Sequence, residues 1–145
     1  MKTRTCASSL VLAGVLAASG SAVAQQQPYP DLKGTWTGPG VTLAVGKTEH
    51  RQPEDTGLRF REDSWTLVID RQEGNRFTGT RGRTEGTRRD PILGVIRADR
   101  KTIHMVDDDG TFLAILTAPD TVEVCRTEVD ADSQGVSCTE ATRQR

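Results

Sequence analysis

The sequence predicts an all-β protein, an up-and-down antiparallel β-barrel of about eight strands with one disulfide. Three observations lead to this prediction. Short segments rich in β-branched residues alternate along the chain with glycine, proline and acidic turns. Beyond the first 24 residues, no ten-residue stretch carries apolar residues at helical spacing. Cys125 and Cys138 lie close enough in sequence to join neighbouring strands.

The expected strands follow one another with short connections between them. Their residue types fit a pleated, half-buried surface. We expect strands at Leu32–Gly38, Val41–Val45, Gly57–Arg61, Ser64–Asp70, Arg76–Arg81, Ile92–Ala98, Thr102–Asp107, Thr111–Thr117, Thr121–Thr127 and Val136–Ala141. Alternation within the fourth segment places Trp65, Leu67 and Ile69 on one face. The stretch Lys47–Thr56 is too polar and too interrupted to assign.

Three turns carry recognisable chemistry. Gly74–Asn75 can adopt positive φ at low cost. Asp109–Gly110 suits a two-residue hairpin turn, which would pair Met105 with Ala114. Asp130–Gly135 closes the last hairpin. Because eight to ten strands would otherwise leave two edges open to aggregation, we expect the sheet to close into a barrel, with a two-sheet sandwich as the alternative.

The beginning of the chain has the pattern of an export signal. Lys2 and Arg4 precede the apolar run Leu10–Ala18, and Ala22–Ala24 supplies small residues for cleavage. The run is about half the length of a membrane-spanning helix, so we expect no membrane anchor and a periplasmic or secreted protein. The expected segments are a signal peptide at 1–24, a flexible leader at 25–31 and a barrel domain at 32–145.

Composition limits the partners and the redox state. Cleavage leaves 121 of the 145 residues, 17 basic and 20 acidic, for a net charge of −3. This balance argues against a nucleic-acid ligand, because such binding gains from a basic excess. Cys6 lies in the signal peptide and is removed with it. We therefore expect Cys125 and Cys138 to form a disulfide that stabilises the fold by about 3 kcal/mol. Thiolate ligation is the alternative, but two histidines in the whole chain make a poor zinc set, and we expect no metal and no cofactor.

The segment Leu32–Gly38 resembles the opening strand of the lipocalin and avidin barrels through Gly34, Thr35 and Trp36, which match their Gly-x-Trp motif. The resemblance implies a structural role for Trp36, which would close one end of the barrel by packing. Phe77–Thr80 and Trp65–Leu67 also look like avidin strand fragments. The whole chain is similar to small exported bacterial proteins of unassigned function that pair this opening with a late cysteine hairpin.

The aromatic content departs from these families. Avidins hold biotin with several tryptophans, whereas this chain has two, so we expect no biotin site. Lipocalin sites surround a cavity with apolar and aromatic side chains, and we expect such a site to need more than about 150 Å3. The alternative is a barrel filled by aliphatic side chains that holds no ligand. The candidate ligand-lining residues are Trp65, Phe77, His104, Met105 and Phe112.

The chain offers little for catalysis. His50 has no neighbouring set of metal ligands. Asp107–Asp109 lacks the alternating donors of a calcium loop and is expected to be an acidic turn. No serine has a nucleophile motif, and no glycine-rich phosphate loop precedes a helix, so we expect no enzyme.

The densest basic run is a candidate anion site, and solvated loop residues are the alternative. It consists of Arg81, Arg83, Arg88 and Arg89, of which Arg81 and Arg83 would share one face of a strand. The preferred function is a non-catalytic exported barrel that binds a small ligand at its open end. The alternative is a protein-binding module such as an envelope protease inhibitor, in which Gln25–Asp31 would be the working segment.

Overall fold

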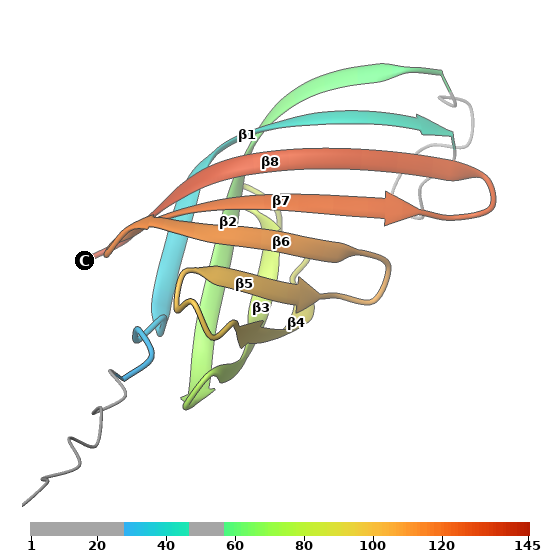
Figure 1. The fold of residues 1–145 in the computed structure, drawn as a ribbon. Coiled ribbons are helices and arrows are strands. Elements are labelled where there is room, and N and C mark those ends of the chain that lie inside the picture. Colours follow the sequence, from blue (N-terminus) through green and yellow to red (C-terminus); the bar gives the residue numbers. More distant parts are fainter. Residues whose placement is uncertain (1–27, 47–56) are drawn as a thin grey trace, which may run out of the picture.

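The computed structural model describes residues 28–46 and 57–145, which form eight antiparallel strands (Figure 1). They are β1 (Gly34–Gly46), β2 (Arg59–Glu73), β3 (Arg76–Arg83), β4 (Asp90–Ile96), β5 (Thr102–Val106), β6 (Thr111–Ala118), β7 (Thr121–Val129) and β8 (Ser133–Arg143). Each strand pairs with its sequence neighbours, and β1 also pairs with β8, which confirms the closed up-and-down barrel. This described part of the chain contains no helix with the length and hydropathy that a membrane crossing requires. The predicted signal peptide, residues 25–27 and His50 lie outside it.

Two pairs of expected strands are single strands in the structure. The first two expected segments join as β1, and the third and fourth join as β2. Strand β1 continues through Pro39 because its pairing with β2 is unbroken there, whereas its ladder to β8 omits Gly38 and Pro39. A proline lacks the N–H that a ladder needs, so it fits where one side of the strand is unpaired.

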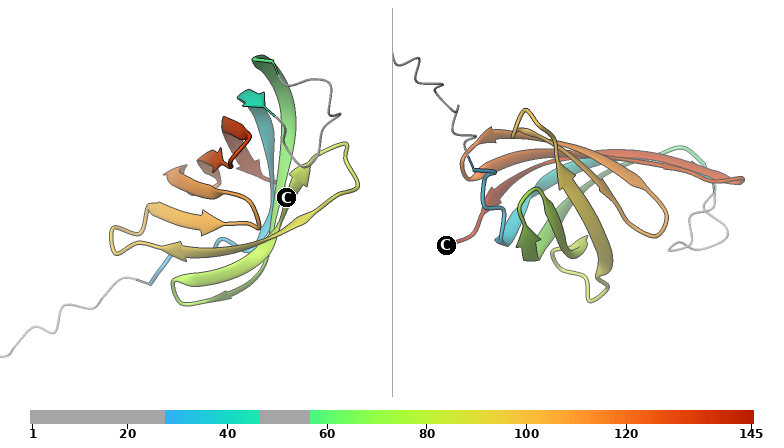
Figure 2. Two further views of the ribbon diagram at one scale, coloured as in Figure 1. Left: turned by 90° about the vertical axis from the view of Figure 1, so that its right-hand side faces the viewer. Right: turned by 60° about the horizontal axis from the view of Figure 1, so that its bottom comes forward.

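The strands differ in length, and this difference makes the two ends of the barrel unlike. Strands β1, β2, β7 and β8 project beyond the short strands β4 and β5 (Figure 1). The left view of Figure 2 looks from the side on which the long strands project. Their inner faces therefore form one wall of an open end.

The core is a single cluster of inward-facing side chains. The shared inner face predicted for Trp65, Leu67 and Ile69 is confirmed, with Leu67 and Ile69 buried. Gly94 makes room for Phe77, because an added Cβ would lie 2.1 Å from the tip of that ring. The buried cluster consists of Leu32, Trp36, Leu67, Ile69, Phe77, Ile92, Ile96, Ile103, Met105, Phe112, Ala114, Val122, Val124 and Ala141.

One predicted hairpin register is wrong. The β5–β6 connection spans four residues, Asp107–Gly110, instead of two, and Met105 pairs with Phe112 rather than with Ala114. The amide of Asp107 donates to the carbonyl of Gly110 across this loop. The Asp107 side chain turns inward and pairs with Arg126, a residue far away in sequence that local turn rules do not include.

The other two predicted turns are present. Gly74 has φ +60° in the two-residue loop between β2 and β3. The β7–β8 hairpin turns within the expected segment, and Cys125 lies directly opposite Cys138 in its ladder. The two cysteines form the predicted disulfide, with a Cα–Cα distance of 4.1 Å.

Trp36 lies at the end opposite the projecting strands. Only 1% of Trp36 is exposed, and its Nε1 donates to the carbonyl of Leu32 at 2.8 Å. The guanidinium of Arg143 lies over the ring, 4.4 Å from its centroid. Arg143 also donates to the carbonyls of Asp31 and Lys33, which holds the chain that enters β1 against this end. The barrel is therefore covered here and open at the other end.

Candidate functional site

The open end of the barrel contains a hollow of about 410 Å3, which we term the mouth groove. Its lining comes from β1, β2, β7, β8, the end of β3, the start of β4 and the connection between these last two strands. Alternation along β2 places Arg61, Asp63 and Trp65 on this inner face, and alternation along β1 places Thr42 and Ala44 there. A hollow of this size falls within the range of small-molecule sites.

The barrel interior below the groove is nearly filled. The void there measures about 20 Å3, which is enough for one water molecule. Its lining includes Trp36, Trp65, Arg81, Phe112 and Thr139. The interior is far below the 150 Å3 that a ligand cavity needs, whereas the mouth groove exceeds that size. Only the open end can therefore hold a ligand of ordinary size within the described barrel.

Four of the five candidate ligand-lining residues, Phe77, His104, Met105 and Phe112, line one hollow on the outside of the barrel, whereas Trp65 does not. Trp65 lines both the mouth groove and the interior void. Phe77, Met105 and Phe112 are each less than 5% exposed and belong to the core. His104 is exposed and lies between two buried residues of β5, so it points outward and takes no part in the mouth.

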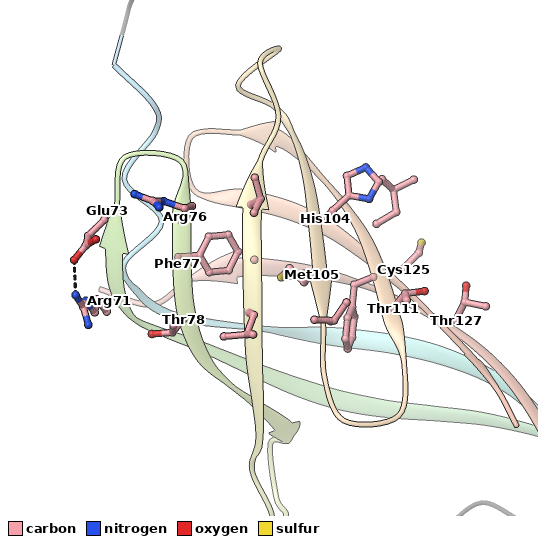
Figure 3. Close-up of a pocket in the computed structure, with 16 residues that line it drawn as sticks. Arg71, Glu73, Arg76, Phe77, Thr78, His104, Met105, Thr111, Cys125 and Thr127 are labelled. Atoms are coloured by element: carbon pink, nitrogen blue, oxygen red, sulfur yellow. Dashed lines mark hydrogen bonds and ion pairs between the residues drawn. The ribbon is translucent and has the colours of Figure 1, made fainter.

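Outside the barrel, a wider hollow of about 900 Å3 crosses the strands from β2 to β7 (Figure 3). Its lining includes His104 and four exposed apolar side chains, Leu93, Val95, Val106 and Leu113. Phe77 and Met105 contribute to it from the core side of the sheet. This hollow lies on the outer surface, and its polar lining includes Arg71, Glu73 and Arg76 as well as His104.

Arg126 of β7 is the centre of a partly buried charge cluster beside the mouth. Its guanidinium pairs with Asp107 at 3.3 Å, with Glu128 at 2.6 Å and with Asp109. Only 2% of the Asp107 side chain and 14% of the Glu128 side chain are exposed. Three carboxylates therefore share one cation. The sequence of the acidic turn alone does not predict this arrangement.

Burial and charge move the pKa values in this cluster in different directions. Burial lowers the pKa of Arg126, but its hydrogen bond to Glu128 and the charge of Asp107 outweigh that effect and raise the pKa. Burial raises the pKa of Asp109, and the neighbouring charge of Arg126 opposes that rise. Arg126 therefore keeps its charge and favours the ionised form of Asp109.

The candidate anion-binding arginines have separate surroundings. Arg83 pairs with Asp63 at 3.3 Å, and Arg88 pairs with Asp90 at 2.6 Å, all at the rim of the mouth groove. Arg89 donates to the backbone carbonyls of the β3–β4 connection. Arg89 therefore stabilises a loop, while Arg83 and Arg88 are matched by acids.

Arg81 is the exception among them. It is 8% exposed, and its guanidinium lies 3.8 Å from the centroid of Trp65 and 5.0 Å from that of Phe112. Burial, together with the charge of Arg126, lowers the pKa of Arg81 to about 10, so it is still charged at neutral pH. Within the described chain its side chain forms neither an ion pair nor a hydrogen bond.

Two further polar atoms of the groove are buried without a partner. They are Nε1 of Trp65 and Oγ1 of Thr42. The Trp65 ring lies close over β1 because residue 40 is glycine, where a Cβ would lie 3.0 Å from its Cδ1. Buried polar atoms are nearly always satisfied, so orphaned ones lining a groove indicate a missing ligand or water.

Sequence reasoning did not identify Arg61, Asp63 or Arg126. The alternation of side chains along a strand could have identified Asp63 and Arg126. Arg126 shares one face of β7 with Val122 and Val124, and Asp63 shares one face of β2 with Trp65. A charged side chain on the apolar face of a strand indicates a buried ion pair or a site. The partners of Arg126 come from the β5–β6 loop, and no local pattern specifies that contact.

The outer surface of the projecting strands is apolar. Val136 of β8, Leu43 of β1 and Phe60 of β2 lie side by side in the ladders and are 51%, 37% and 79% exposed. Val41 continues this surface along β1 with 60% exposure. We term these four residues the outer apolar patch.

Comparisons of the chain with protein-family models, curated proteins and solved structures found no match. The resemblance of Gly34, Thr35 and Trp36 to the opening of lipocalin and avidin barrels therefore stays a prediction. The fold and the mouth groove are the grounds on which a role can be assigned.

Proposed function

We propose that this protein is a non-catalytic, exported binding protein that takes a small ligand into the mouth groove. The observation that carries the proposal is the pair of buried, unpartnered polar atoms in that groove, Trp65 Nε1 and Thr42 Oγ1. A buried polar group without a partner costs about 1–3 kcal/mol, and a bound ligand or water would recover part of it. The filled interior and the roomy mouth both favour binding at the open end.

The test is native mass spectrometry of the protein purified from its own cells. We expect a ligand of small-molecule mass bound to the processed chain. A Thr42→Phe variant fills the groove and should lose that mass, whereas Leu43→Phe, one residue along on the outer face, should keep it. Thermal melts of both variants check the fold. A wild-type protein without added mass, or a Thr42→Phe protein that retains it, would contradict the proposal.

A protein partner is the second candidate function, and the outer apolar patch is the observation that favours it. Exposed contiguous apolar side chains often mark protein interaction sites. A photo-crosslinking residue in place of Phe60 should give one discrete adduct in the producing cell. Leu43→Ser together with Val136→Ser should abolish the adduct, because these side chains flank position 60 in the ladders. An adduct that survives both substitutions, or none at all, would exclude this role for the patch.

A further inference from the structure

The carboxylates that line the mouth groove, and the β5–β6 loop acids beside them, form ion pairs with three arginines. Their ion pairs join Asp63 to Arg83, Asp90 and Asp108 to Arg88, and Asp107, Asp109 and Glu128 to Arg126. A ligand that enters the groove therefore meets negative charges that already have partners. A cationic ligand would have to compete with these arginines.

Arg81 is different, because it is a buried cation without a direct ion pair in the described chain; the charges of Asp107, Asp90 and Asp109 act on it only from a distance. It is 92% buried, and its contacts are the faces of Trp65 and Phe112. Aromatic faces attract a cation by up to about 2 kcal/mol when the pair is desolvated, but they accept no full hydrogen bond from its N–H groups. An anion that accepts hydrogen bonds would supply the acceptor that these two rings do not provide.

The other unpartnered polar groups of the groove would also be satisfied by a hydrogen-bond acceptor. Trp65 Nε1 can only donate, and the Thr42 hydroxyl can donate or accept, so an oxygen acceptor would satisfy both. Trp65 lines both the groove and the void beside Arg81, and the void of about 20 Å3 suits a single oxygen atom. The half-buried ring of Trp65 also offers a flat apolar surface.

We infer that the ligand of the mouth groove is a small monocarboxylate. Its carboxylate pairs with Arg81 and accepts a hydrogen bond from Trp65 Nε1, while a flat apolar part lies in the groove. One unpaired arginine matches one negative charge. A second charge on the ligand would lie beside Asp63, Asp90 and Glu128, which also line the groove. The inference deepens the proposed function and rests on it.

The test uses three probes of similar shape and different charge: benzoate, neutral benzamide and dianionic phthalate. The readout is the pair of indole N–H signals in a proton–nitrogen correlation spectrum, since the chain has two tryptophans. We expect benzoate to shift the Trp65 signal and to leave that of Trp36, which is bonded to Leu32, in place. Benzamide and phthalate should bind at least about tenfold more weakly, the usual effect of losing or opposing a charge-assisted hydrogen bond.

Arg81→Met removes the charge and keeps an apolar chain between the two rings. It should reduce benzoate affinity by about tenfold or more. Arg76→Met, on the exposed face of the same strand, should leave affinity unchanged. The Trp36 signal reports folding in each sample. If Arg81→Met does not fold, the comparison of benzoate with benzamide on the wild-type protein tests whether the groove requires a carboxylate.

The outcomes separate the inference from the proposed function. Equal shifts with benzoate and benzamide, unaffected by Arg81→Met, would show a groove that binds ligands without a carboxylate requirement and would overturn the inference alone. No shift with any probe would also overturn it, while the mass measurement on the native protein decides the proposed function independently. Tighter binding of phthalate than of benzoate would refute the single-charge argument.

Discussion

Replacing Arg126 with methionine should lower the free energy of unfolding by about 3–5 kcal/mol at pH 7, the typical cost of removing one partner from a buried charge cluster. Asp107, Asp109 and Glu128 would remain together without their shared cation. Asp107 has the least access to water, with a side chain that is 2% exposed. Urea denaturation of both proteins measures the difference.

The loss should depend on pH. In the native protein burial already raises the pKa of Asp109, and Arg126 is the charge that opposes this rise. Without Arg126, the folded pKa of Asp109 should lie further above its unfolded value. An acid with a raised folded pKa destabilises the fold above that pKa, and the cost disappears as the pH falls below the unfolded value. The difference between the two proteins should therefore shrink towards about pH 4, where unfolded carboxylates begin to protonate.

Arg76→Met provides the matched control, because Arg76 lies on the exposed face of β3. Its effect should stay within about 0.5 kcal/mol at both pH values, as is usual for a surface substitution. A loss for Arg126→Met that is equally large at pH 7 and pH 4 would mean that packing, rather than charge, explains it.

Local rules account for most of the fold and fail where distant contacts intervene. Period-two alternation placed Trp65, Leu67 and Ile69 correctly because a strand has only two faces. The two-residue turn predicted at Asp109–Gly110 is wrong: the loop has four residues, and its Asp107 pairs with Arg126 of β7, a contact that local turn rules do not include. The error moves the pairing by two residues and so leaves every side chain on its predicted face.

The site was less accessible to sequence reasoning. The basic run correctly indicated that Arg81 and Arg83 share a face, and both lie on the inner side. The sequence could not show that Arg83 has an acid partner and Arg81 has none, because Asp63 and Trp65 come from another strand. Their placement depends on the β2–β3 ladder, whose register shifts between Ile69 and Arg71. The bulge therefore sets which β2 residues lie beside these two arginines.

Trp36→Ala should destabilise the protein by about 3–5 kcal/mol, as expected for a fully buried aromatic side chain. Trp36 is 1% exposed, and its loss would leave a cavity, remove the hydrogen bond to Leu32 and deprive Arg143 of its stacking surface. Trp36→Phe keeps most of the apolar contact and should cost less. Thermal or urea unfolding of the two variants measures both effects.

Trp65→Ala is the informative comparison, because it removes the same side chain from the other end of the barrel. Trp65 is only partly buried and faces the groove, so its loss should cost less stability than that of Trp36. It should instead abolish any ligand-dependent shift, since its ring and Nε1 form the groove surface beside Arg81. If the two tryptophans proved equally important for stability, the distinction between a covered structural end and an open binding end would be lost.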